Sequence, residues 1–366
     1  MKKLRIGVAG LGRAFSLMAS AFRDPRVQLV AAADPRAEAR AKFEADFQGK
    51  SFATVEEICA NPGVDLVYVA TPHELHAEHA CAALSAGKSV LVEKPMALTL
   101  DAGRRMVQAA RHSGAHLIVG HSHSFDLPIL HTRKLIDAGA FGPVRMITGM
   151  YFSDFVYRPR RPGELATAVQ NQSAHHVDIT RLLAGGRVRS VRAFTGDWDR
   201  ARPASGAYSC LLGFDNGACA SLTYSGYGHF DSDELMGWIG ELGQRKQPSA
   251  FAQHPPDEEK NARNYGGPQF RELERVAHEH FGMFIVSCEK ADLRPLPDGV
   301  MIYSGTQRRL DPVPAPRVPR VEVIDEIYAA LVEGKAPLHS GESALATLQV
   351  CLAILDSARQ GKEILL

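Results

Sequence analysis

The first 120 or so residues alternate short apolar runs with amphipathic stretches. The apolar runs predict β-strands at residues 5–9, 27–33, 65–70, 89–92 and 116–119. Between them, helical spacing predicts helices from an early glycine turn through Leu17 and Phe22, and at residues 37–47, 74–85 and 100–112. Strands that alternate with helices in this way are typical of βαβ units and of an α/β, doubly wound parallel sheet.

After Gly120 the pattern becomes one of alternating strands. A helix through 132–136 ends at Gly139, and strands are predicted at 144–152, 188–195, 208–214, 218–224 and 234–239. Asp215-Asn216-Gly217 predicts a hairpin turn between two of them. A helix at 174–183, a polar loop at 244–268 and closing helices at 321–333 and 342–359 complete the prediction. We therefore expect a first domain at 1–121 and, at 122–366, an α+β domain with a large, mostly antiparallel open sheet.

Composition excludes several classes of protein. The chain has 366 residues with a formal net charge of +1, whereas a nucleic-acid-binding protein normally carries a large basic surplus. No apolar run approaches the ~20 residues that cross a bilayer, and the N-terminus lacks the apolar segment of a secretory signal. The 6 cysteines are scattered without CxxC pairs, which is typical of reduced thiols. We expect a cytoplasmic protein that contacts neither nucleic acid nor membrane.

A glycine turn, Gly10-Leu11-Gly12, joins the first predicted strand to the first helix. Glycine lets the backbone approach a diphosphate, whose charge is favoured at a helix N-terminus. Phe15 replaces the third glycine of the usual dinucleotide-binding pattern, at a position that serves helix–strand packing more than phosphate contact. We predict a Rossmann domain in which this turn, with Arg13 and Ala14, contacts the cofactor. An ordinary βα turn is the alternative.

Asp34 stands at the end of the second predicted strand, about 20 residues after the glycine turn. A carboxylate there hydrogen-bonds the adenosine ribose and repels a 2′-phosphate, which favours NAD over NADP. Arg36 follows closely and could accommodate that phosphate instead. NAD is the predicted cofactor, and NADP is the less favoured one.

Two motifs follow the next predicted strands. One is Ala70-Thr71-Pro72-His73 with His76, and the other is Ala86-Gly87-Lys88 leading into Glu93-Lys94-Pro95. Together they resemble the glucose–fructose oxidoreductase / inositol dehydrogenase / MocA family, and the similarity covers nearly the whole chain. The resemblance implies an NAD(P)-dependent dehydrogenase whose cofactor region is lined by Thr71, Pro72, His73, His76, Glu93 and Lys94. It also implies that Glu93 fixes the lysine, and that Pro95 follows a cis bond in many members.

Lys94 follows the carboxyl end of a parallel strand, where open α/β sheets bind ligands. A lysine there can stabilise the alkoxide that develops as hydride leaves a substrate alcohol. A solvated surface lysine is the alternative for any isolated lysine, but the surrounding tripeptide favours catalysis.

The family's third motif matches the stretch from Asn171 to Asp178. The resemblance makes His175 the catalytic histidine and puts Asn171 where relatives usually carry aspartate. We expect His175 to take the hydroxyl proton while Lys94 polarises the oxygen, with Lys94 as the other possible acceptor. Asn171 cannot accept the proton, so it would orient His175 or the substrate. Asp178 would hold the imidazole or pair structurally.

His73, His76 and His79 recur at every third position, which superficially suggests a metal site. In the family the first two positions line the nicotinamide and ribose, and the dehydrogenation needs no metal. We therefore predict no metal site.

The predicted substrate site includes His123 and the loop arginines Arg158, Arg160 and Arg161. Arginines can bind carboxylates through paired hydrogen bonds, although a solvated loop or a subunit contact explains them equally well. With the third motif, these stretches are similar to the phthalate 4,5-dihydrodiol (4,5-dihydroxyphthalate) dehydrogenase subgroup. The resemblance implies oxidation of a carboxylated cis-dihydrodiol, cis-4,5-dihydroxy-4,5-dihydrophthalate, to 4,5-dihydroxyphthalate.

Two alternative functions remain open, and the resemblance also carries an expectation about oligomeric state. A sugar, inositol or other polyol dehydrogenase is the nearer alternative, and an NAD-binding glycosidase or non-redox sensor is the second. The intact Lys94 and His175 argue against the sensor. Because the family is generally oligomeric, we expect a homo-oligomer, either dimer or tetramer.

Overall fold

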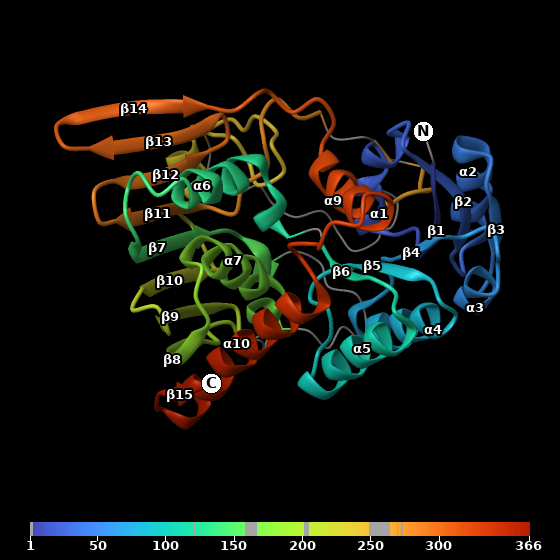
Figure 1. Ribbon diagram of the computed structural model, residues 1–366, viewed down its shortest axis with the longest axis horizontal. Coiled ribbons are helices and arrows are strands. Elements are labelled where there is room, and N and C mark those ends of the chain that lie inside the picture. Colours follow the sequence, from blue (N-terminus) through green and yellow to red (C-terminus); the bar gives the residue numbers. More distant parts are fainter. Residues whose placement is uncertain are drawn as a thin grey trace.

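Two β-sheets organise the chain (Figure 1). The computed structural model describes residues 3–120, 122–157, 167–200, 205–248, 264–268, 270–271 and 274–366. The N-terminal sheet lies on the right of Figure 1 and the larger C-terminal sheet on the left. Within the described ranges, none of the helices has both the length and the apolar character that crossing a bilayer requires.

The N-terminal sheet has six parallel strands in the order β3-β2-β1-β4-β5-β6. Their bounds are β1 (Leu4–Ala9), β2 (Val27–Ala33), β3 (Lys50–Phe52), β4 (Leu66–Val69), β5 (Ser89–Val92) and β6 (Leu117–Val119). The order reverses between β1 and β4, which is where doubly wound sheets bind ligands at the carboxyl ends of their strands. The predicted Rossmann sheet is confirmed.

Helices and short 3₁₀ turns connect these strands. They are α1 (Arg13–Met18), η1 (Ala21–Arg23), α2 (Ala37–Phe47), α3 (Val55–Cys59), η2 (His73–Leu75), α4 (His76–Ser85) and α5 (Leu100–Ser113). The prediction of one helix through Phe22 was wrong, because α1 ends at Met18 and Phe22 lies on the separate turn η1. Phe22 nevertheless stacks on Phe15, with 6.3 Å between ring centroids, so both buried aromatics face one core.

The C-terminal sheet has nine strands in the order β14-β13-β12-β11-β7-β10-β9-β8-β15. They are β7 (Val144–Phe152), β8 (Val188–Gly196), β9 (Ala207–Phe214), β10 (Cys219–Ser225), β11 (Met283–Cys288), β12 (Asp292–Leu296), β13 (Gly299–Ser304), β14 (Gln307–Pro312) and β15 (Ile364–Leu365). Only the β7–β10 pair is parallel among these described pairings, so the expected mostly antiparallel sheet is confirmed. The predicted Asp215-Asn216-Gly217 hairpin joins β9 to β10.

The sequence pattern failed at two places in this sheet. The strand predicted at 234–239 was wrong: these residues begin in the 3₁₀ helix η5 (Ser232–Met236). The side chain of Asp231 caps that turn by accepting the backbone N–H of Asp233, and Gly237 ends it with a φ of 70°. Strands β11 to β14 were not predicted, although β11 alternates buried and half-buried residues.

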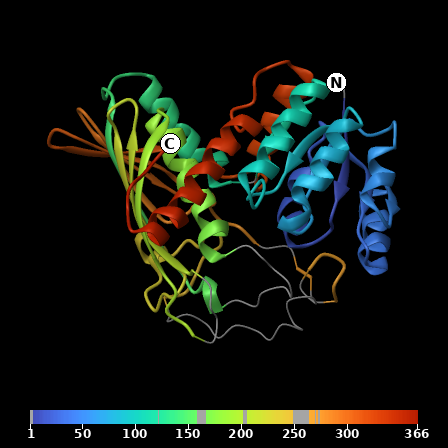
Figure 2. The same ribbon diagram turned by 90° about the horizontal axis from the view of Figure 1, so that it is seen from below.

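Long helices fill the space between the sheets. The second half of the chain contributes η3 (His123–Phe125), α6 (Leu127–Asp137), η4 (Phe155–Tyr157), α7 (Ala168–Ala184), α9 (Val321–Val332) and α10 (Gly341–Gln360). Figure 2 shows α7 and α10 between the two sheets, and α10 contacts β8, α7 and α5. The opposite face of the large sheet is covered by no helix of the described ranges.

Helix α9 returns to the N-terminal sheet. Its buried Val323, Ile324 and Ile327 belong to the same hydrophobic cluster as Ile6 and Val8 of β1. A division at residues 121 and 122 remains a proposal, and α9 is a segment beyond that boundary that packs in the first core.

Candidate active site

Lys94 and helix α7 meet between the two sheets. Lys94 lies two residues beyond β5, and its peptide bond to Pro95 is cis. Its Nζ donates a hydrogen bond of 2.8 Å to Oδ1 of Asn171 on α7. Two predicted catalytic residues that are 77 positions apart are therefore in direct contact.

Helix α7 begins six residues before the predicted start at Ala174. Thr167 and Gln170 form a capping box, in which the Thr167 hydroxyl accepts the Gln170 N–H and the Gln170 side chain accepts the Thr167 N–H. These two bonds satisfy N–H groups that the first helical turn leaves unpaired. The earlier start puts Asn171, His175 and Asp178 within one continuous helix, where positions four and seven apart share a face.

His175 is buried between aromatic neighbours. Its ring centroid lies 4.6 Å from that of His123 and 4.7 Å from that of Phe281. The backbone N–H of His123 donates a long hydrogen bond of 3.4 Å to Nδ1 of His175. An acceptor role at Nδ1 favours the neutral tautomer with its proton on Nε2.

Asp178 pairs structurally, which was one of its two predicted roles. Its carboxylate accepts hydrogen bonds from the hydroxyls of Ser124 and Thr347, the latter at 2.9 Å. These bonds tie α7 to η3 and to α10.

His123 faces two protein carboxylates. Its Nδ1 lies 2.7 Å from Oδ2 of Asp126, and its Nε2 lies 3.7 Å from Oε1 of Glu241. Burial lowers the pKa of His123, but the charges and hydrogen bonds of Asp126 and Glu241 outweigh it and raise that pKa to about 9. Glu241, which the sequence did not single out, also accepts a 3.0 Å bond from the Tyr151 hydroxyl. His123 remains a proposed substrate residue, and its imidazole lies beside that of His175.

Glu93 lies on the core side of the tripeptide. Its buried carboxylate accepts a 2.6 Å hydrogen bond from the hydroxyl of Tyr68 on β4. Burial, reinforced by the negative charge of Glu93, raises the pKa of Tyr68 well above its ordinary value. Neutral Tyr68 therefore anchors the strand end from which Lys94 projects.

The histidines near η2 and α4 contact backbone and threonine atoms. His76 is fully buried, with Nδ1 2.9 Å from the Pro95 carbonyl oxygen and Nε2 2.9 Å from that of Thr71. Burial lowers its pKa. Nδ1 of His79 lies 3.0 Å from the hydroxyl of Thr71. His76 thus joins the turn after β4 to the turn after β5, and Thr71, Pro72 and His73 lie at that junction.

A different cluster brings possible metal ligands together. Atoms of His123, Asp126 and Glu279 lie within 4.8 Å of one another. However, Glu279 is ion-paired with Arg320 at 3.1 Å and with Arg275 at 2.6 Å. Two guanidinium groups already compensate this carboxylate, so the cluster is accounted for as an ionic network.

The glycine turn has the shape that a dinucleotide requires. Gly10 has a φ of 94°, and a Cβ there would lie 2.7 Å from the Ala70 carbonyl oxygen. A Cβ at Gly12 would have no atom within 4 Å, so this glycine faces open space at the start of α1. Arg13 and Ala14 are the first residues of that helix. These residues fit the diphosphate of a dinucleotide, which they would hold against backbone N–H groups.

Asp34 is engaged by the protein itself. Its carboxylate accepts the Leu11 N–H at 2.8 Å, the Arg36 N–H at 2.9 Å and the Arg36 Nε at 3.0 Å. Arg36 also reaches the Leu11 carbonyl oxygen at 2.9 Å and that of Tyr265 at 3.4 Å. NAD and NADP would therefore both meet an Asp34 carboxylate that is already paired with Arg36.

Phe15, which replaces the third glycine, is fully buried in an aromatic cluster. Its ring meets that of Tyr265 edge-on, with centroids 4.8 Å apart. The Tyr265 hydroxyl donates a 2.8 Å hydrogen bond to Asp46 on α2. The sequence missed Tyr265 because it lies within the predicted loop 244–268.

The predicted substrate residues Arg158, Arg160 and Arg161 lie outside the described residues.

Comparisons with known proteins agree with this arrangement. A family model described as an oxidoreductase family with an NAD-binding Rossmann fold matches residues 4–121, and a GFO/IDH/MocA C-terminal domain model matches residues 129–244. The chain is 46% identical over 378 residues to a 1-carboxy-3-chloro-3,4-dihydroxycyclohexa-1,5-diene dehydrogenase of Comamonas testosteroni, covering 97% of this chain and 95% of that protein.

Two further relatives extend the comparison. Inositol 2-dehydrogenase 2 of Saccharopolyspora erythraea is 30% identical over 69% of this chain and 74% of its own. A crystal structure from Bordetella bronchiseptica RB50, provisionally described as a dehydrogenase, has a TM-score of 0.93 with 36% identity and covers 100% of both chains.

Proposed function

The chain belongs to the glucose–fructose oxidoreductase / inositol dehydrogenase / MocA family of oxidoreductases, and from this premise we propose that it oxidises a carboxylated cis-dihydrodiol with NAD⁺. The specific substrate that we propose is cis-4,5-dihydroxy-4,5-dihydrophthalate, and its product is 4,5-dihydroxyphthalate. The observation that carries the proposal is the contact between Lys94 and Asn171, beside the buried His175, next to the carboxyl end of β5.

The Comamonas relative supports the substrate class. Its name describes a ring with one carboxyl group, one chlorine, two adjacent hydroxyl groups and two ring double bonds. A phthalate dihydrodiol shares the carboxyl group, the diol and the two double bonds, but it has no chlorine and carries a second carboxylate. The pairing of a diol with a carboxylate on a partly reduced ring is thus common to the relative and to the proposed substrate.

The chain's own residues divide the proton chemistry. Bound NAD⁺ supplies the hydride acceptor. The amino group of Lys94, held by Asn171, takes the hydroxyl proton as the C–O bond gains double-bond character. The Nδ1 contact favours the tautomer with the proton on Nε2, and we assign this N–H as a hydrogen-bond donor to the substrate. This assigns to Lys94 the acceptor role first expected for His175.

The product chemistry favours oxidation. Removal of hydride from one carbinol carbon and of its hydroxyl proton gives a ketone. The proton on the other carbinol carbon then moves to the ketone oxygen, which gives a catechol. The net change is one NAD⁺ reduced and one proton released for each diol, and aromaticity is gained.

We also propose that the carboxylate groups of the substrate are bound by Arg158, Arg160 and Arg161.

Reduced-nicotinamide absorbance with a panel of substrates tests the function. The expected result is turnover with cis-4,5-dihydroxy-4,5-dihydrophthalate and NAD⁺, and formation of 4,5-dihydroxyphthalate. Turnover confined to a mono-carboxylated dihydroxycyclohexadiene would support the proposed substrate class, a carboxylated cis-dihydrodiol, but would contradict the specific phthalate substrate. Activity only with inositol or free sugars would overturn the proposal in favour of a polyol dehydrogenase. Tightly held NAD without net reduction would favour a glycosidase or sensor.

We also propose that the chain forms homo-oligomers through the uncovered face of the large sheet. Phe194 on β8 is 66% exposed, and Leu211 on β9 is 60% exposed. Their strands are neighbours, and apolar side chains on an uncovered sheet face are typical of a buried interface. Light scattering after size exclusion distinguishes dimer from tetramer, and a Phe194→Glu/Leu211→Glu double variant should be monomeric.

A further inference from the structure

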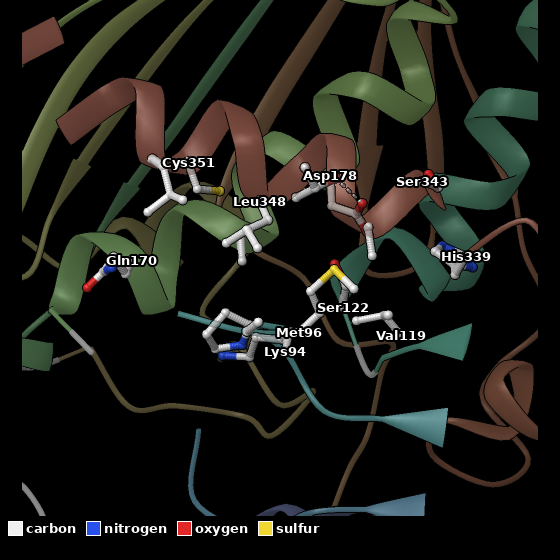
Figure 3. A pocket seen from close by; sticks show the side chains of 16 residues that line it. Lys94, Met96, Val119, Ser122, Gln170, Asp178, His339, Ser343, Leu348 and Cys351 are labelled. Carbon is white, nitrogen blue, oxygen red and sulfur yellow. Dashed lines mark hydrogen bonds between the residues drawn. The ribbon is translucent and has the colours of Figure 1, made fainter. Parts of the chain in front are cut away.

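A pocket lies beside Lys94, between the tripeptide turn, α7 and α10 (Figure 3). The volume between its walls is about 570 Å³, and this volume includes space that is open to the surrounding solvent. Most of its wall is apolar, with Met96 and Val119 on one side and Leu348, Cys351 and Leu352 of α10 on the other. We call this cavity the rear pocket. Lys94 belongs to its lining, whereas His175 does not.

Two buried polar atoms face the rear pocket without a hydrogen-bond partner among the described residues. They are Oγ of Ser122 and Nε2 of His339. Ser122 is 4% exposed and His339 is 6% exposed. In Figure 3, Ser122 lies between Lys94 and His339 in the plane of the view. Buried polar atoms normally have partners, so this pair marks a place that water or a polar ligand satisfies.

His339 is connected to the protein surface on its other side. Its Nδ1 lies 2.7 Å from Oε2 of Glu326 on α9, and its backbone N–H donates to the other oxygen of the same carboxylate at 2.7 Å. The Phe125 ring stacks on the imidazole, with centroids 3.5 Å apart. The Glu326 side chain retains 15% exposure. With a proton on Nδ1, His339 presents the Nε2 lone pair to the rear pocket.

The other acid of the rear pocket is already used. Asp178 lines it, but its oxygens accept the Ser124 and Thr347 hydroxyls. Of the described lining residues, Lys94 carries an amino group, and Ser122 and His339 carry the buried polar atoms that have no hydrogen-bond partner among those residues.

We propose that the rear pocket releases the proton of the oxidation, by a path from Lys94 through water and Ser122 to His339 and Glu326. The inference rests on the proposed function, which produces one proton for each hydride. The amino group of Lys94 takes the substrate hydroxyl proton, and water bridged by the Ser122 hydroxyl carries it to Nε2 of His339. His339 gives its Nδ1 proton to Glu326, which exchanges with solvent. No bond other than O–H and N–H bonds changes on this path.

Single-turnover stopped flow tests the path. Reduced nicotinamide is followed by absorbance and the released proton by a pH indicator in weak buffer. In the unmodified enzyme the two signals should coincide, with one proton for each NADH. In His339→Gln, which can still bond to Glu326 but does not titrate, proton release should lag NADH formation by about tenfold or more. Added imidazole should remove the lag.

Two further variants keep the test decisive. His131→Gln is the matched control, because His131 forms a 2.9 Å pair with Asp311 away from the pocket. It should show no lag. Ser122→Ala should lag as His339→Gln does, and it carries the test if the histidine variant fails to fold. A merely structural defect slows both signals together.

The outcomes separate the two proposals. Absence of NADH with every dihydrodiol contradicts the proposed function, and the lag is then measured with whichever polyol the enzyme oxidises. Proton release in step with NADH in both His339→Gln and Ser122→Ala overturns the path.

Discussion

Nζ of Lys94 donates to Oδ1 of Asn171 across 2.8 Å, so the strand-end lysine is held by a neutral amide on the helix that carries His175. Relatives with aspartate at this position would provide a charged partner. Here the amide oxygen fixes the lysine in place without adding a negative charge beside it.

The Asn171 contact should act on catalysis more than on binding. We expect Asn171→Ala to lower kcat about 10- to 100-fold with little change in KM, because the lysine loses the acceptor that orients it. Steady-state kinetics measures this split. Asn171→Asp keeps an acceptor oxygen and should recover part of the loss. An alanine variant with unchanged kcat would contradict the positioning role.

Removal of Lys94 itself should have a larger effect. Lys94→Ala is expected to lower kcat about 10²- to 10⁴-fold, because the proton acceptor is lost, and His175→Ala should lower it by a smaller factor in this range. Lys88→Ala is the matched control, since Lys88 stands immediately before the same strand β5. Unchanged turnover in Lys94→Ala would falsify the proposed mechanism.

Cofactor choice should depend on the Asp34–Arg36 pair. In Arg36→Ala the Asp34 carboxylate loses the guanidinium at 3.0 Å and repels a 2′-phosphate more strongly. The ratio of kcat/KM for NAD⁺ to that for NADP⁺ should rise about tenfold. Asp34→Ala should move the ratio in the opposite direction. If both variants leave the ratio unchanged, this pair does not select the cofactor.

Phe15 should matter for stability. Phe15→Ala removes a fully buried ring that meets Tyr265 and Phe22, and we expect a loss of about 3–5 kcal/mol in the free energy of unfolding. Denaturant titration measures it. Phe230→Ala is the matched control, because that ring is 44% exposed and should change the value by less than about 1 kcal/mol. Equal losses in the two variants would refute a special role for the cluster.

The pH dependence of stability should reflect His123. Its pKa is raised from 6.5 to about 9, so its contribution is fully present below pH 6.5 and is lost as pH rises through 9. The contribution is on the order of 3 kcal/mol at most. His123→Gln should therefore destabilise the protein more at pH 6 than at pH 10. A difference that stays constant across this window, measured by denaturant titration, would be incompatible with a charged His123.

Local signals predicted much of the fold. The β2, α2, β5 and β7 bounds agree with the ranges that apolar spacing predicted, because each element buries one regular set of side chains. The pattern did not predict β14, since most of its residues are exposed. It misread residues 234–239, where a side-chain cap and a left-handed glycine overrode an alternating pattern.

The site divides in the same way. The glycine turn and the Glu93-Lys94-Pro95 tripeptide could be placed from sequence, because a turn and a strand end are local features. The partner of Lys94, the two carboxylates around His123 and the polar atoms of the rear pocket could not. These contacts join residues from separate elements, so they exist only once α7, α9 and α10 have packed between the two sheets.

The sequence by itself determined the parallel sheet, its glycine turn and the position of a lysine at the end of β5, because periodicity and glycine conformation act over a few residues. Only the tertiary structure decided which groups touch that lysine. Side chains 77 positions apart meet through the packing of helices between two sheets, and no short-range pattern encodes that meeting.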